Sequence, residues 1–122
     1  MRPEGRVLIA DMIASEDPDK AAYHNRMERL CDPTHVCALP LSAFENLFSH
    51  AGLAIVLRPT SVLHYDVGEW IAHGGPCAAD AEQIVSLMEA STDPDRSGLN
   101  VRRENGTLRF SHTAVAFVLR RG

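Results

Sequence analysis

The apolar run Arg6-Val7-Leu8-Ile9-Ala10 most constrains how this chain of 122 residues folds. An uninterrupted apolar stretch of this length is typical of a strand that is buried on both faces of a sheet. Such a strand normally has a neighbour on each side, but only the turn-like Arg2-Pro3-Glu4-Gly5 precedes it. We therefore expect a central strand with one edge that no earlier strand covers.

The next segment predicts a helix with clear ends. Asp17 can cap the helix, Pro18 fits its first turn, and Asp32-Pro33 ends it after about Cys31. Helical spacing gives it one apolar stripe, made of Tyr23, Met27, Leu30 and Cys31. We expect the other face to be solvated, with Lys20, Asn25, Arg26 and Glu28 in water.

A second helix is predicted from a capping box. Ser42 stands three residues before Glu45, and Gly52 supplies a left-handed stop. The expected buried stripe consists of Phe44, Leu47, Phe48 and Ala51.

The remainder of the chain alternates between strands and helices. A strand from Leu53 to Tyr65 is interrupted at Pro59, which cannot donate to a ladder. Asp66 and Glu69 precede a short helix that carries Trp70 and Ile71 and ends at Gly74-Gly75-Pro76. A helix over 78–90 follows, with Ala81, Ile84, Val85 and Met88 on one side. Asn105-Gly106 then predicts a hairpin with a type I′ turn, whose second arm is the apolar Ala114-Val115-Ala116-Phe117-Val118-Leu119.

This order of elements predicts an α/β fold, in which helices pack on a small mixed sheet. The first strand and the strand at Leu53 are expected to be parallel, and the last strand is expected to be antiparallel to them if it lies between them. The length fits a single domain over residues 1–122.

Composition excludes several kinds of function. A net charge of −4 offers no broad basic surface for nucleic acid. No apolar run approaches the roughly 20 residues of a membrane span, and no secretory signal is visible, so we expect a cytoplasmic protein. The odd number of cysteines, Cys31, Cys37 and Cys77, favours free thiols over a disulfide framework.

Two segments resemble a known family. The stretch from Arg2 to Asp11 is similar to the segment that leads into the fifth strand of class I S-adenosylmethionine-dependent methyltransferases, in particular the type 11 branch with the ubiquinone and menaquinone enzymes. Glu28-Arg29-Leu30-Cys31-Asp32-Pro33-Thr34-His35-Val36 resembles the "E-x-x-R-D-P-S-H-V-R" segment of a subset of that branch. Ala51-Gly52-Leu53 and Trp70 also stand where that subset has similar residues. Two positions depart from the pattern, because Glu4 replaces a glycine and Cys37 replaces an arginine that could hold a substrate anion.

The resemblance covers only the C-terminal half of the family's domain. It implies a Rossmann-like methyltransferase half that shapes the acceptor pocket. The glycine-rich loop, the acidic residue for the ribose and the adenine contacts belong to the other half of the family domain. We therefore expect no cofactor-binding residues in this chain, and S-adenosylmethionine only in the complete domain.

Five residues are candidates for the substrate pocket. Asp11 is expected at the carboxyl end of the first strand, where open α/β sheets bind ligands, although an Asp at the start of a loop is also an ordinary turn residue. Asp32 and His35 can form an acid/base or orienting pair; alternatively, Asp32 and Thr34 cap a turn on which His35 packs. The resemblance adds Arg29 and Trp70, and the residue type at Trp70 favours a core or lid position over a base-stacking platform.

A metal site is a weaker interpretation. Cys31, His35 and Cys37 have a spacing that matches no common zinc site, and a fourth ligand would have to come from His73 or Cys77. The histidines at 24, 50, 64 and 112 are scattered, and we expect them at surface or half-buried positions. We therefore predict no metal.

Two functions from different classes remain open. The chain can be the acceptor-side half of a methyltransferase, inactive alone and either truncated or completed by a partner that binds the cofactor. Alternatively, it can be a non-catalytic module of the same fold for oligomerisation or for binding a small ligand. In both cases the exposed edge of the strand at 6–10 predicts pairing with the missing half or in a homo-oligomer.

Overall fold

The last strand, β6 (Thr107–Arg121), is the strand to which nearly all others pair. The computed structural model describes residues 5–122, so most of the turn expected at 2–5 lies outside the described residues. β1 (Val7–Ala14) and β5 (Arg102–Glu104) pair antiparallel with one edge of β6, and β3 (Leu53–Leu57) and β4 (Thr60–Asp66) pair antiparallel with the other. The first strand and the strand at Leu53 are parallel, as predicted, and β6 lies between them and is antiparallel to both.

A very short parallel pair makes the sheet mixed. β2 (Leu39–Pro40) pairs with β1 only at Ile13 and Ala14. Among the described residues, the rest of the outer edge of β1 has no strand partner. The α/β class with a small mixed sheet is therefore confirmed, but the expectation that the first strand is buried on both faces is wrong, because Leu8 is 68% exposed.

The interruption at Pro59 is also confirmed. The register of β3 against β6 shifts between Ile55 and Leu57, and β4 begins directly after the proline. Pro59 has no N–H to donate, but its carbonyl oxygen accepts from the Ala116 N–H at 3.0 Å. The strand therefore continues along β6 on both sides of the break.

Most helix ends lie where local signals place them. α1 (Pro18–Cys31) is capped by the Asp17 carboxylate, which accepts from the Asp19 and Lys20 N–H groups. α3 (Val67–Gly74) is capped by Asp66 and ends at Gly75, which has a φ of 70°. α4 (Ala78–Ala90) has the predicted bounds. The hairpin turn is as expected, because Asn105 and Gly106 both have positive φ.

The predicted start of α2 (Leu41–His50) is wrong. Ser42 is not the cap residue, because the helix begins one residue earlier and Pro40 precedes it. Ser42 donates its backbone N–H and its hydroxyl to the Glu16 carboxylate instead, and Glu45 forms an ion pair with Arg58 at 2.8 Å. A carboxylate from a distant loop thus replaces the local capping box.

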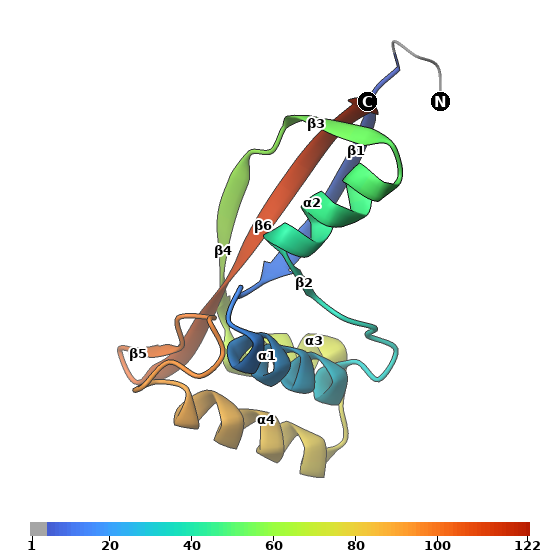
Figure 1. Ribbon diagram of the computed structural model, residues 1–122. Helices are drawn as coiled ribbons and strands as arrows, with labels where there is room; N and C mark the ends of the chain where they lie inside the picture. The colour runs from blue at the N-terminus through green and yellow to red at the C-terminus, as the bar shows by residue number, and fades with distance from the viewer. Residues whose placement is uncertain (1–4) are drawn as a thin grey trace.

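The helices form two groups along the sheet (Figure 1). α2 packs Phe44 and Phe48 against Phe117, whereas Leu47 (57% exposed) and Ala51, which were expected in this stripe, face solvent. Nothing among residues 5–122 covers that outer side of α2. At the other end of β6, α1, α3 and α4 enclose a second core, which contains Met27, Val67, Ile84, Met88 and Phe110. Val85 of α4 lies outside this core and is 36% exposed.

Candidate functional site

A small pocket lies at the carboxyl end of β1. It has a volume of about 230 Å³ and is lined by Ile13, Ala14, Ser15, His24, Gly98, Leu99 and Thr113. Open α/β sheets bind ligands at the carboxyl ends of their strands. A larger hollow, of about 560 Å³, lies between α2 and β3 instead, near the other end of β6. The topology of the sheet therefore favours the smaller pocket as the candidate site.

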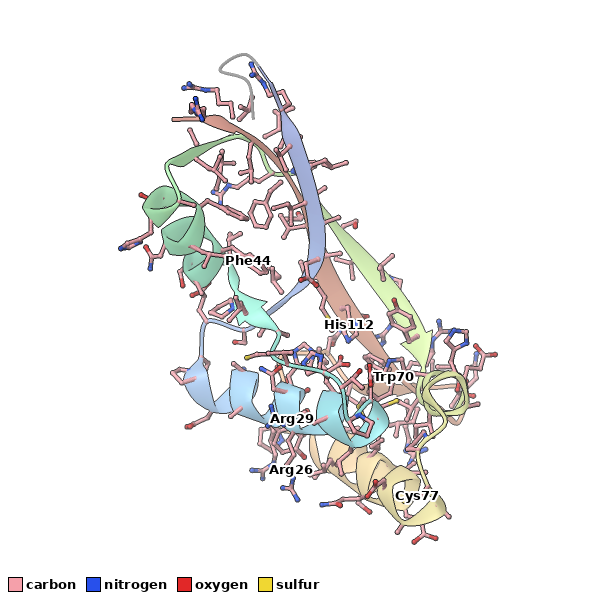
Figure 2. All side chains as sticks on the ribbon, turned by 90° about the vertical axis from the view of Figure 1, so that its right-hand side faces the viewer. Arg26, Arg29, Phe44, Trp70, Cys77 and His112 are labelled. Carbon is pink, nitrogen blue, oxygen red and sulfur yellow. The ribbon has the colours of Figure 1, made fainter. Side chains whose placement is uncertain are left out.

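Three buried polar side chains converge beside this pocket, and we call them the His–Glu–His cluster: His24, Glu28 and His112. His24 and Glu28 are one turn apart on α1, so both face the same way. His24 Nε2 donates to Glu28 Oε1 at 3.2 Å, and His112 Nε2 lies 3.2 Å from the same oxygen. Figure 2 places His112 between β6 and α1.

The cluster is almost fully shielded from water. The exposed fractions of His24, Glu28 and His112 are 1%, 7% and 6%. Rings surround His112, since its centroid lies 5.4 Å from His24, 5.2 Å from Tyr65 and 5.1 Å from Phe110. Burial opposes ionisation of Glu28, but the contacts with His112 and His24 outweigh it and lower the pKa of this carboxyl to about 2.

Two ring nitrogens of the cluster have no hydrogen-bond partner. They are His24 Nδ1 and His112 Nε2; the contact of His112 with Glu28 has a suitable length but not the direction of a hydrogen bond. Buried polar atoms are nearly always hydrogen-bonded, so these two nitrogens need a physical explanation.

The sequence-based expectation for these residues was wrong. Asn25 and Glu28 were expected in water, and His24 and His112 at surface or half-buried positions, but all four are buried. α1 packs on α4 on one side and approaches β6 and the loop at 32–38 on the other, so it has no wide solvated face. The spacing of His24 and Glu28 by four residues was the available signal, but no local pattern links them to His112.

Another buried polar residue, Asn25, holds the loop that contains Asp32 and His35. The Asn25 amide donates to the Ala21 and Ala38 carbonyls and accepts from the Ala38 N–H and from His35 Nε2. Asp32 accepts from the N–H and hydroxyl of Thr34, and these bonds lower the pKa of its carboxyl. The side chains of Asp32 and His35 therefore do not form the expected pair. Each bonds to another residue, and Asp32 and Thr34 form the turn that was the alternative interpretation.

The other candidate residues lie apart. Asp11 is not at the end of β1, because the strand continues to Ala14; it pairs with Val115, and its exposed carboxylate accepts from the Met12 N–H. Arg29 is exposed in the last turn of α1 (Figure 2). Trp70 packs edge-on against Phe110 and lines a different pocket of about 430 Å³, together with His64, Tyr65, Asp66, Glu69, His73 and Arg109.

The cysteines do not assemble a metal site. Buried Cys31 points its thiol at the Trp70 carbonyl, Cys37 is exposed and contacts the Ala38 carbonyl, and His35 bonds to Asn25. Among the described residues, one group of three His, Cys, Asp or Glu side chains is close enough to share an ion, and it is the His–Glu–His cluster.

The adjacent glycines Gly74 and Gly75 do not form a turn of the kind that holds a nucleotide cofactor. A phosphate or ribose cradle in this fold is a glycine-rich turn that follows a strand. Gly74-Gly75 ends a helix instead, and a side chain at Gly74 would collide with the Cys31 thiol. This glycine pair is thus explained by helix termination and packing.

Comparison with known proteins identifies similar chains. No protein-family model matches the sequence. The sequence is 33% identical over 98 residues to the uncharacterized methyltransferase YcgJ of Bacillus subtilis strain 168, which is 79% of this chain and 38% of that protein. The chain thus spans less than half the length of this relative.

Two solved structures share the fold. The crystal structure of Bacillus subtilis YcgJ matches all of this chain with a TM-score of 0.83 and 28% identity, over 53% of its own length. A Bacillus halodurans C-125 structure described as a methyltransferase matches 96% of this chain with a TM-score of 0.86 and 15% identity, over 55% of its own length. Among residues 5–122, no helix is long and apolar enough to cross a membrane.

Proposed function

Because this chain matches the C-terminal half of a methyltransferase domain, we propose that it is the acceptor-binding side of a methyltransferase, and that residues outside this sequence bind the cofactor. The observation in the structure that supports this most directly is the pocket at the carboxyl end of β1. S-adenosylmethionine is the cofactor implied for the complete domain.

The pocket suits the task of positioning an acceptor. Methyl transfer from a sulfonium donor depends mainly on alignment of the nucleophile with the methyl group. His24 lines the pocket and is backed by Glu28, whereas Ile13, Ala14 and Leu99 give the pocket apolar walls. A small acceptor can therefore bury its apolar part there and direct an oxygen or nitrogen toward His24.

The outer edge of β1 is the surface on which the cofactor-binding half would pair. Within residues 5–122, a strand covers that edge of β1 only at Ile13 and Ala14, and Leu8 is 68% exposed. In the absence of the complementary half, we propose that two copies of the chain pair along this edge, because unpaired N–H and C=O groups beside apolar side chains favour association. The free thiols of Cys31, Cys37 and Cys77 support a cytoplasmic location.

Cofactor binding tests the proposed function. The DNA on the 5′ side of the Met1 codon, or an adjacent reading frame, is expected to encode a glycine-rich cofactor-binding segment. Calorimetry should show that the protein carrying this segment binds S-adenosylmethionine and that residues 1–122 alone do not. Tight binding by residues 1–122 alone, or no such segment nearby, would contradict the proposal.

Sedimentation velocity at a protein concentration of tens of micromolar tests whether two copies pair along the outer edge of β1. We expect a dimer for residues 1–122 and a monomer for Leu8→Glu. Leu47→Glu is the matched control, because Leu47 is also exposed (57%) but lies on α2, away from this edge. A monomeric parent chain, or a Leu8→Glu chain that stays dimeric, would refute pairing along β1.

A further inference from the structure

The His–Glu–His cluster is arranged like a metal-binding site. His24, Glu28 and His112 each offer one ligand atom, and these atoms lie within 4.8 Å of one another. They come from two elements, α1 and β6, that are distant in the sequence. We propose that this cluster binds one divalent transition-metal ion of the zinc type, which goes beyond the proposed function and does not depend on it.

The distances suit such an ion. Two ligands that are each about 2.0–2.1 Å from a tetrahedral zinc lie roughly 3.3–3.4 Å apart. The two contacts of Glu28 Oε1, with His24 Nε2 and with His112 Nε2, are both 3.2 Å. The third separation, between the two histidine ligands, is at most 4.8 Å.

The ring nitrogens without partners support the same conclusion. Each histidine of the cluster has one buried nitrogen with no hydrogen bond: Nδ1 of His24 and Nε2 of His112. A purely structural cluster would be expected to satisfy these atoms, because an unpaired buried polar atom is costly. Coordination uses a nitrogen lone pair directly, so an ion bound by His24 Nε2, Glu28 Oε1 and His112 Nε2 provides the missing partner of His112 Nε2, whereas His24 Nδ1 is not one of these ligand atoms.

The ligand types define the class of ion. Imidazole nitrogens suit zinc, copper, iron and nickel, whereas magnesium and calcium prefer sets made only of oxygen ligands. Three protein ligands, two His and one carboxylate, are the number found where the ion keeps a position open for water or substrate. The pocket at the end of β1, which His24 and Thr113 line, is the adjacent space for that further ligand.

The test uses the full chain with Zn²⁺ alone and with Co²⁺ as a spectroscopic probe. After treatment with a chelator, the protein should bind one equivalent of Zn²⁺ by calorimetry, and its Tm should rise on binding. Co²⁺ should give visible absorption bands that Zn²⁺ abolishes. Glu28→Gln, which keeps the shape of the side chain, and His112→Gln should each weaken binding by at least about 100-fold.

Matched controls separate this site from others. His50→Gln removes an exposed imidazole of α2 that contacts the Asn46 carbonyl, and it should leave binding unchanged. Replacing both exposed thiols, Cys37→Ser with Cys77→Ser, should also leave it unchanged. If a cluster variant does not fold, as circular dichroism would show, the Co²⁺ bands of the parent and the cysteine variant still decide the question.

Three results would overturn the inference. The first is a folded parent chain that binds no Zn²⁺, and the second is binding that is lost with the cysteines. The third is binding that persists when a folded protein carries Glu28→Gln. Because none of these experiments includes S-adenosylmethionine, failure here leaves the proposed methyltransferase role unaffected.

Discussion

Replacement of Asn25, the one side-chain amide on α1, by alanine should destabilise the protein strongly. The buried Asn25 side chain donates to the Ala38 carbonyl at 3.1 Å and accepts from the Ala38 N–H at 2.6 Å. Ala38 is 5% exposed, so Asn25→Ala leaves two backbone groups and His35 Nε2 without their partner. Each buried unpaired group costs about 1–3 kcal/mol, and partial relaxation of the loop at 32–38 gives a total of about 3 kcal/mol.

Urea unfolding monitored by circular dichroism measures this change in the free energy of unfolding. For a domain of this length, 1 kcal/mol corresponds to about 4 °C, so Tm should fall by about 12 °C. Asn46→Ala is the control, because Asn46 is exposed on α2, and surface substitutions usually stay within about 0.5 kcal/mol. If Asn25→Ala also stays within that range, the amide does not hold the loop and the reasoning is refuted.

Three further predictions address packing and pH. Gly74→Ala should lower the free energy of unfolding, measured in urea, by about 2 kcal/mol, because the added Cβ would collide with the Cys31 thiol. Cys31→Ala in the same chain should restore most of this free energy, and no rescue would count against the contact. Phe117→Ala should cost about 3–5 kcal/mol, since Phe117 is fully buried against Phe48 and Phe44; a loss below 1 kcal/mol would mean that this core is not packed as described. Partial burial opposes ionisation of Asp95, but hydrogen bonds from the Gly98 and Ser97 N–H groups lower the pKa of its carboxyl. The ionised carboxylate therefore stabilises the folded protein above the unfolded-state pKa, and this stabilisation is lost as the pH falls below about 4. Asp95→Asn should therefore lose less stability between pH 5 and pH 3 than the parent chain, and equal slopes would contradict this contribution.

Local signals predicted the elements well where no distant residue competes. Asp17-Pro18 and Asp32-Pro33 bound α1 because a cap, a preset φ and a proline act within a few residues. Asn105-Gly106 defines the hairpin for the same reason. The start of α2 was misplaced because Glu16, 26 residues earlier, takes the hydrogen bonds of Ser42.

The candidate site was much less accessible to sequence reasoning. The position of Asp11 depends on how far β1 extends, and the pairing of β1 with β6 decides this length. His112 stands in β6 between Ser111 and Thr113, and its partners lie on α1, 84 or more residues earlier in the sequence, so no local pattern links them. An amphipathic pattern assumes one wet face, so it assigns Asn25 and Glu28 to solvent although α1 is covered on more than one side.

The central position of β6 has a consequence for synthesis of the protein. β1, β3, β4 and β5 all pair with this strand, which occupies the last part of this sequence. Each of these strands is therefore synthesised before its common partner exists. Val7, for example, cannot pair until Leu119 has been synthesised. The nascent chain would expose its unpaired apolar strands throughout translation, so chaperone binding during synthesis and slow, all-or-none closure of the sheet are expected for this topology.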